Sequence, residues 1–415
     1  MMQLNRRNVV QNIAALFSGS MVAQGMTALA LLITARQLGA ASYGQYASCF
    51  ILASFTSIVF SLGLDIWLLR EGGRNPAQLA EAVGSVLAIK LALGLGWLAA
   101  MLALSQFLDS VTFPAGLLQL AVISIWLDTL FSTPLTAFKA SLRNQFTSLL
   151  EGGADTAWFA VTLALIAAGE RQAANFIWAR IAVQAIFLVI ALALVGRVVR
   201  LHPNLSTARR AVRETLPFAA SEFLAWTSMR VDVLIVALLL SETDVGQYSP
   251  AVGIVNAAFL VPAAVYFVIA PVLSNLFVTN MWQGWLTARR SLLLLLAVGV
   301  AMSLALFTLA GPAVALLGQS FSGSRQVLQI LSAILFVHSL SFGLAAILIA
   351  ANLQARRTVV QVVAVFVNIS LNLLVVRWAG IRGAAVVYVI TEMVLFSGYG
   401  WLVWQHWRQA EAGRR

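Results

Sequence analysis

The sequence LLLLLAVGVAMSLALFTLAG fills residues 292–311 without a single charged residue. A bilayer's hydrocarbon core takes about 20 residues of helix to cross, and a helix satisfies its own backbone hydrogen bonds where water is absent. Eleven further apolar stretches of about this length or a little longer occupy most of the remaining 415-residue chain. The sequence therefore predicts an all-α polytopic membrane protein with about twelve transmembrane helices.

The composition agrees with this class. Hydrophobic residues make up 61% of the chain and charged residues 10%, whereas soluble domains carry about 25% charged residues. No stretch is polar enough to form a separate soluble domain. The predicted helices lie near residues 10–35, 45–69, 80–105, 114–138, 147–168, 173–196, 215–240, 246–277, 289–317, 326–351, 357–378 and 382–405.

The positive charges predict the orientation of the chain. With the N-terminus in the cytoplasm, 19 of the 26 Lys and Arg residues fall in cytoplasmic segments and six, including Arg36 and Arg180, in outer segments. The remaining residue, Arg230, is assigned to neither side and is left inside a helix. Basic residues concentrate on the cytoplasmic side of membrane proteins, so the net charge of +11 indicates topology and not nucleic-acid binding. Both termini are predicted to be cytoplasmic.

The chain repeats part of itself. LGAASYGQY at residues 38–46 follows the first predicted helix, and LSETDVGQY at residues 240–248 follows the seventh, 202 positions later. Six helices per half is an even number, so both halves enter the membrane from the same side, as in parallel-repeat transporters. We expect two six-helix bundles related by a pseudo-two-fold axis along the membrane normal, around a cavity. The predicted divisions are 1–196, a cytoplasmic linker at 197–213, and 214–415.

Charged residues inside the seventh predicted helix are the first candidates for a functional site. A charge at mid-bilayer is costly and normally faces a partner or an aqueous cavity. Glu222 and Arg230 are eight residues apart, roughly 80° around a helix, so both can face one cavity. Asp232 neutralises a neighbour or lies nearer the outer surface. The alternative is a buried ion pair that does not contact substrate.

The first half carries further candidates for ion coupling or for lining a cavity. Asp65 and Asp128 lie in the second and fourth predicted helices. Glu151 and Asp155 share one face of the fifth helix through their i,i+4 spacing. Lys90 is expected to extend its ammonium group to the membrane surface, as long basic side chains do.

Other polar residues leave two interpretations open. Arg36 and Arg70 lie near helix ends and are either membrane anchors or substrate ligands. Glu392 is isolated in the last predicted helix, where it makes a structural hydrogen bond or carries a proton. Asn368 and Asn372 share one face of the eleventh helix. They line the cavity or, as we favour, hydrogen-bond to a neighbouring helix.

Several kinds of chemistry are disfavoured. The single Cys49 excludes a disulfide framework, and His202, His338 and His406 have no metal-ligand spacing. No phosphate-binding GxxxxGK[ST] loop occurs, so no cofactor is expected. The outer loops are short and contain few acidic residues, which disfavours a membrane enzyme such as a glycan ligase or acyltransferase.

Four segments resemble the polysaccharide flippases of the Wzx type. They are ARQLG and YGQY within residues 35–46, GL and LRE within 63–71, PF, RVD and VGQYS within 217–249, and GIRGAA followed by Glu392 within 380–392. The likeness covers almost the whole chain. It implies the multidrug/oligosaccharidyl-lipid/polysaccharide exporter (MOP) superfamily, whose members have two six-helix lobes around a central cavity.

The resemblance also implies a function. Wzx-type proteins move undecaprenyl-diphosphate-linked oligosaccharides across the bacterial inner membrane, and cationic side chains are thought to receive the diphosphate. Arg230 is the first residue to which this role carries over, followed by Arg36 and Arg70. The implied partners are the lipid-linked oligosaccharide, membrane lipids, and a polysaccharide polymerase with other assembly proteins. Few cations lie within the predicted helices, which leaves a less acidic glycan open. A drug/cation antiporter of the same superfamily is the alternative.

Overall fold

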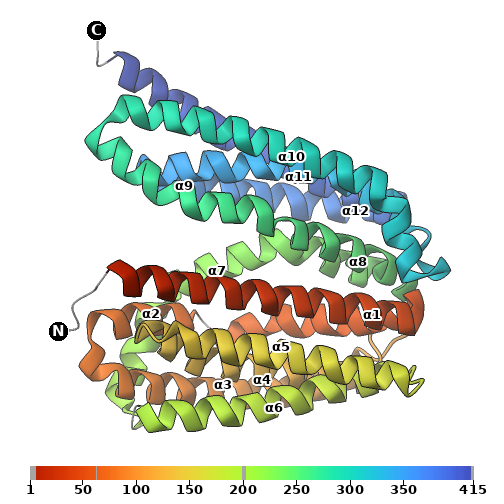
Figure 1. Ribbon diagram of the computed structural model, residues 1–415. Coiled ribbons are helices and arrows are strands. Elements are labelled where there is room, and N and C mark those ends of the chain that lie inside the picture. The colour runs from red at the N-terminus through yellow and green to blue at the C-terminus, as the bar shows by residue number, and fades with distance from the viewer. Residues whose placement is uncertain (1–5, 62, 199–201, 413–415) are drawn as a thin grey trace. The chain divides into compact units, whose positions relative to one another are not determined.

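The computed structural model describes residues 6–61, 63–198 and 202–412, and within these residues every regular element is a helix (Figure 1). The chain divides into two compact units, unit 1 at Met1–Trp226 and unit 2 at Thr227–Arg415. The α-helices are α1 (Arg6–Ser61), α2 (Leu64–Arg74), α3 (Leu79–Phe107), α4 (Ala115–Ala140), α5 (Asn144–Ala167), α6 (Ala173–Val198), α7 (Leu205–Leu239), α8 (Glu242–Ala258), α9 (Leu260–Thr279), α10 (Met281–Leu317), α11 (Ser324–Ala350) and α12 (Gln354–Ala412). Two short 3-10 helices, Pro76–Gln78 and Gln319–Phe321, precede α3 and α11.

The helices supply the predicted membrane passes. Among the described residues, nine stretches are long and apolar enough to cross a bilayer. Two of them belong to α1 and α12, which have 56 and 59 residues and each contain two passes. The passes meet at Gly39 and Gly380, whose φ angles of 74° and 59° favour glycine. With the 35-residue α7, the order of the helices matches the twelve predicted passes, and the predicted fold class is confirmed.

Two predicted helices are interrupted. The helix expected at 45–69 breaks near Gly63, whose φ of 68° is left-handed, and continues as α2. The helix expected at 246–277 is divided into α8 and α9, which meet at Phe259. Pro262 follows three residues later, and its missing N–H removes one helical hydrogen bond at this junction.

In unit 1, α4 is the central helix. It packs against α1, α2, α3, α5 and α6 (Figure 1). Helices in lipid associate through close packing because lipid tails are as apolar as their side chains. At Gly94 of α3, an added Cβ would collide with the Trp126 indole nitrogen of α4. The absence of a side chain at Gly94 therefore lets α3 and α4 approach closely.

In unit 2, α11 has the corresponding place. It packs against α8, α9, α10 and α12. In its apolar membrane-spanning stretch 61% of the residues are buried, against 11% in that of α10. The exposed surface of α10 carries large apolar side chains such as Leu294 and Phe307, as expected of a helix that faces lipid. Because α4 and α11 are the fourth passes of their halves, the structure supports the internal repeat.

Unit 1 ends at Trp226 and so extends beyond the predicted linker at 197–213. From Leu205 onward this segment is already the first part of α7. Glu214 of α7 accepts hydrogen bonds from Arg70 Nη2 at 2.7 Å and from Trp67 Nε1 at 2.9 Å, both on α2. These contacts attach the beginning of α7 to unit 1.

Candidate functional site

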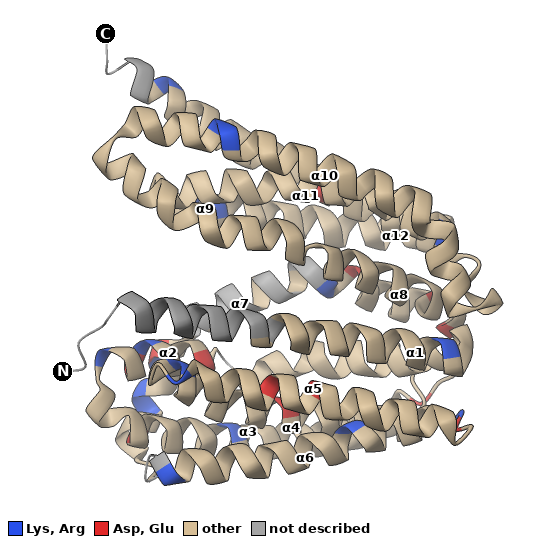
Figure 2. Cartoon of the chain, in the orientation of Figure 1, with Lys and Arg blue, Asp and Glu red and all other residues tan. Residues whose placement is uncertain are grey.

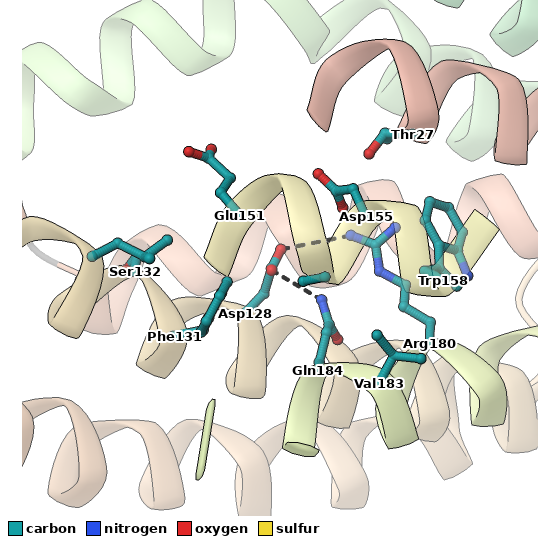
Figure 3. A pocket seen from close by; sticks show the side chains of 12 residues that line it. Thr27, Asp128, Phe131, Ser132, Glu151, Asp155, Trp158, Arg180, Val183 and Gln184 are labelled. Carbon is teal, nitrogen blue, oxygen red and sulfur yellow. Dashed lines mark hydrogen bonds and ion pairs between the residues drawn. The ribbon is translucent and has the colours of Figure 1, made fainter. Parts of the chain in front are cut away.

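A cavity of about 310 Å³ lies inside unit 1. It is bounded by α1, α4, α5 and α6, and charged side chains project into it from three of these helices (Figure 3). Figure 2 also shows acidic residues along the middle of α4 and α5, in a bundle whose other charges lie mostly toward helix ends. The lining residues are Thr27, Asp128, Phe131, Ser132, Leu135, Glu151, Ala154, Asp155, Trp158, Arg180, Val183 and Gln184.

Arg180 is the cation of this cavity. Its Nη2 lies 3.7 Å from Asp128 Oδ2, and its guanidinium carbon lies 4.6 Å from the centre of the Trp158 ring. The face of an aromatic ring attracts a cation, and the attraction is stronger when the cation has lost its hydration water. Gln184, one turn further along α6, donates a hydrogen bond to Asp128 Oδ1 at 2.9 Å. The assignment of Arg180 to an outer segment is wrong, because Arg180 lies seven residues into α6, which begins at Ala173, and its side chain lines the cavity.

Three carboxylates share the cavity with this one guanidinium. Glu151 and Asp155 both line it from α5, as their i,i+4 spacing predicts, and Asp128 faces them from α4. Figure 3 shows Asp155 directed toward Thr27 of α1. An excess of negative charge away from water favours uptake of a proton or a cation. In the part of the chain that the structure describes, these three carboxylates and the other His, Cys, Asp and Glu side chains form no group of three that could hold a metal ion.

Asp65 lies beside this cavity in a hydrogen-bond network with Lys90. The Lys90 ammonium donates to Asp65 Oδ2 at 2.7 Å, to the Thr129 carbonyl at 2.9 Å and to Ser132 Oγ at 3.0 Å. Ser132, which lines the cavity, also donates to Asp65 at 2.6 Å. Lys90 does not extend to the membrane surface, because its side chain is 0% exposed and its charge is satisfied inside the bundle.

The two other arginines predicted in unit 1 do not line this cavity. Arg36 is exposed on α1, three residues before the turn at Gly39. Arg70 forms an ion pair with Glu214 at 2.7 Å and is about one-third exposed. Arg36 and Arg70 therefore do not share the cavity with Arg180.

In unit 2, Asp232 is 3% exposed and accepts a hydrogen bond of 2.6 Å from the Tyr248 hydroxyl. Tyr248 is the last residue of the second Gly-Gln-Tyr sequence. Arg230 lies two residues before Asp232 on α7 and is exposed. The side chain of Glu222 lies outside the described residues, so its expected common face with Arg230 stays a prediction.

Asn368 and Asn372 are both almost completely buried. Asn368 Nδ2 donates to Thr391 Oγ1 at 3.0 Å, which joins the two passes of α12, and Asn372 Nδ2 donates to Asn368 Oδ1 at 2.9 Å. These contacts correspond to the expected hydrogen bonding between helices. The substrate-binding role of both residues remains a prediction.

Glu392 is not isolated, in contrast to the sequence interpretation. Its Oε2 lies 3.0 Å from Nδ1 of His338 on α11, and only 5% of its side chain is exposed. The two residues are far apart in the chain, so no local spacing could indicate this pair. His338 and Arg180 are among the site residues that the sequence analysis did not recognise as candidates.

Solved structures with the same fold are membrane transporters. A multidrug resistance MATE family transporter of the MOP superfamily, in an inward-facing conformation, aligns with a TM-score of 0.75 at 14% identity, over 91% of this chain and 93% of its own. The lipid II flippase MurJ aligns with a TM-score of 0.65 at 12% identity, over 94% and 87%. A MOP superfamily transporter from Pyrococcus furiosus aligns with a TM-score of 0.60 at 14% identity, over 94% of each chain.

The chain is thus a multi-pass membrane protein with the same fold as these transporters, which is the fold that the resemblance implied. A family model for polysaccharide biosynthesis proteins matches residues 33–324. The chain belongs to this polysaccharide biosynthesis protein family. No curated protein matches the chain in sequence. The three similar structures are described as transporters or as a flippase.

Proposed function

We propose that the protein is a flippase that moves undecaprenyl-diphosphate-linked oligosaccharide across the bacterial inner membrane, with both termini in the cytoplasm. The path opens first to the cytoplasm and then to the outer face. The charged headgroup and the sugars follow a polar path, while the polyprenyl tail stays in lipid. The product is a precursor for a surface polysaccharide, and a polymerase with other assembly proteins receives it.

The family match over residues 33–324 is the observation that carries this proposal. It connects the chain with polysaccharide biosynthesis, and the MOP fold supplies the means of transport. The charged cavity of unit 1 supports the same assignment, because a protein that only spanned the bilayer would have no need of one. A charge inside the membrane marks a functional site by default.

We assign separate roles to the cations and the acids. Arg230 contacts the diphosphate, because a planar guanidinium pairs with two phosphate oxygens at once, and its exposure on α7 permits this contact. Arg36 and Arg70 are weaker candidates for the same role. The cavity of about 310 Å³ is at the small end of the range for drug-sized ligands, roughly 300–1,000 Å³. It suits a coupling proton or cation on Asp128 or Asp155 better than an oligosaccharide.

The test uses cells whose surface glycan depends on this gene. Arg230→Ala is expected to reduce surface glycan at least tenfold at equal protein level, and lipid-linked oligosaccharide is expected to accumulate inside. Arg230→Lys keeps the charge but loses the two-point contact and is expected to be intermediate. Arg290→Ala on α10, which removes an equally exposed arginine, is the matched control. Unchanged glycan in Arg230→Ala would remove this residue from the mechanism.

A drug/cation antiporter is the second candidate. The excess of carboxylates in the cavity of unit 1 favours it, as Asp128, Glu151 and Asp155 face only Arg180. An antiporter would protect cells against organic cations and would leave surface glycan unchanged when the gene is deleted. Loss of glycan without any change in sensitivity to such cations supports the flippase.

A further inference from the structure

The end of unit 2 at which α12 ends carries a surface that the proposed roles do not use. Gly380 separates the two passes of α12, so the second pass runs from residue 381 to residue 412. At 1.5 Å per residue this pass is about 48 Å long, against about 30 Å of hydrocarbon core. About 20 residues cross the core. Residues from about 401 onward therefore lie at the level of the lipid headgroups.

Trp401, Trp404 and Arg408 are stacked along one exposed face of this projecting segment. The ring centres of Trp401 and Trp404 are 5.2 Å apart, and the guanidinium carbon of Arg408 lies 4.0 Å from the centre of the Trp404 ring. The two indoles are 57% and 39% exposed. Tryptophan is enriched where hydrocarbon meets headgroups. A guanidinium stacked on a ring is held in place, while the N–H groups at its edge point toward phosphate oxygens.

Two more arginines lie at a similar depth, at the start of the first pass of α12. Arg356 and Arg357 come 24 and 23 residues before Gly380, and Arg408 comes 28 residues after it. Arg356 is exposed and Arg357 is half-buried. The guanidinium carbon of Arg357 lies 5.9 Å from the centre of the Tyr399 ring. The two passes of α12 therefore present their cations at the same level of the bilayer.

The helix ends that carry these cations are packed together. His406 of α12 lies 6.1 Å from Trp285 of α10 between ring centres, and the charge of Arg356 acts on His406. Trp285 and Val403 belong to one apolar cluster with Ile347 of α11. The surface is thus built on three packed helices and not on a free chain end.

Among the described side chains, no carboxylate lies near these arginines. In α9, α10, α11 and α12 the one described acidic side chain is Glu392, 16 residues before Arg408. The side chain of Glu411 lies outside the described residues. Arg289 and Arg290 of α10 only add positive charge. Figure 2 likewise shows Lys and Arg but no Asp or Glu among the coloured residues at this end of unit 2.

The corresponding end of unit 1 differs in this respect. There Arg70 pairs with Glu214 at 2.7 Å, and Arg210 pairs with Glu71 at 3.0 Å. In unit 2 the charge at headgroup depth is not balanced within the described part of the protein. A cluster of basic residues next to a membrane-spanning helix attracts anionic lipid.

We propose that this end of unit 2 is a binding surface for the phosphate headgroups of acidic phospholipids such as phosphatidylglycerol. The surface, which we call the Trp–Arg rim, consists of Arg356, Arg357, Trp401, Trp404 and Arg408. Its arginines contact the phosphate oxygens, and its tryptophans pack against the glycerol and the upper part of the acyl chains. Each arginine close to an anionic membrane surface strengthens the attraction roughly fivefold.

The test places a probe next to Arg408. Cys49 is buried, so Gln409→Cys gives the full-length chain one accessible thiol for a fluorophore. The labelled protein is reconstituted in phosphatidylcholine bilayers that contain a small fraction of spin-labelled lipid, either phosphatidylglycerol or phosphatidylcholine, with the nitroxide near the headgroup. Phosphatidylglycerol is expected to quench the fluorophore at least threefold more strongly. About 1 M salt is expected to remove most of this preference, because the Debye length falls to about 3 Å.

Variants locate the preference on the Trp–Arg rim. Arg408→Gln is expected to lower it severalfold, and Arg408→Gln combined with Arg356→Gln and Arg357→Gln to abolish it. Trp404→Leu keeps an apolar side chain but removes the stacking partner of Arg408, and is expected to lower the preference about twofold. Arg171→Gln removes an exposed arginine beside Glu170, in the loop between α5 and α6, and is the matched control.

Equal quenching by the two lipids in wild-type protein would overturn the proposal, as would a preference that survives Arg408→Gln and the triple change. Should the triple variant not fold, the salt dependence and Trp404→Leu still decide the question. Unlabelled undecaprenyl diphosphate is then added at one tenth of the phosphatidylglycerol content. Complete displacement would assign the surface to the transport substrate and contradict the phospholipid assignment. No step of this test requires transport, so the proposed function and this inference can fail separately.

Discussion

Gln45 and Gln247 make the same contact in the two halves of the chain. Each side-chain amide donates a hydrogen bond to a backbone carbonyl in the loop before the fourth pass of its own half, Val111 at 2.9 Å and Ser320 at 3.3 Å. The Gly-Gln-Tyr repeat is thus a structural device. In each unit it joins the turn after the first pass to the loop before the fourth pass.

We therefore expect Gln45→Ala to loosen the loop around Val111. An ordinary hydrogen bond contributes about 1 kcal/mol, so amide hydrogen exchange in residues 108–114 should become roughly fivefold faster. Gln106→Ala, a matched change at an exposed position near the same loop, is the control. Equal exchange in both variants would show that the contact does not order the loop.

The Lys90–Asp65 pair should matter for stability. Lys90→Met removes the buried ammonium and leaves the Asp65 carboxylate with only hydroxyl partners. Breaking a fully buried pair costs roughly 3–5 kcal/mol. We expect a smaller loss, about 2–3 kcal/mol, because the Asp65 side chain is 30% exposed.

Thermal unfolding in detergent checks this pair. The double variant Lys90→Met with Asp65→Asn is expected to be more stable than Lys90→Met alone, because no unpaired charge remains. Additive losses in the double variant would refute a direct coupling of the two side chains.

We expect a side chain at Gly380 to strain the protein because of the backbone geometry at this residue alone. Its φ is 59°, and an added Cβ meets no atom within 4 Å. Gly380→Ala should therefore destabilise the protein by about 1–3 kcal/mol through strain. Gly400→Ala, also in α12 and also in open space, should be neutral or stabilising. Similar melting temperatures for both variants would contradict this explanation.

Arg180 should be needed for transport and not only for folding. Arg180→Gln leaves Asp128 without its ion pair and raises the negative charge of the cavity. We expect translocation to fall at least tenfold in proteoliposomes at equal protein content. Arg180→Lys keeps the charge but stacks less well on Trp158, and should be intermediate. Arg171→Gln in the exposed loop between α5 and α6 is the control, and an equal effect of both glutamine variants would argue against a role of the cavity.

Much of the fold follows from the sequence because apolar length decides it. A stretch such as 292–311 has one stable state in lipid, so the passes and their order could be predicted. The break near Gly63 was not predicted, because a single residue sets it within a continuous apolar run. Arg180 was assigned to an outer segment although the predicted helix at 173–196 begins at the same residue as α6, because the sequence does not show that its side chain points into the bundle.

The candidate site could be predicted only where its residues lie close together in the sequence. Glu151 and Asp155 are one turn apart, so their spacing places both on one face. The partners of Glu392 and Asp65 come from other helices, and neither spacing nor hydropathy records which passes are neighbours. That information arises from packing around α4 and α11, which the sequence pattern does not specify.

The central claim is that the protein moves a lipid-linked oligosaccharide from one leaflet to the other without changing its bonds. The most direct measurement uses sealed liposomes that hold purified protein and undecaprenyl-diphosphate-linked oligosaccharide with a labelled sugar. An enzyme added outside cleaves only the glycan of the outer leaflet. If the protein is such a flippase, nearly all the glycan becomes cleavable with wild-type protein and about half with empty liposomes. Cleavage that stops at half with wild-type protein, or a new covalent product formed before the enzyme is added, would contradict it.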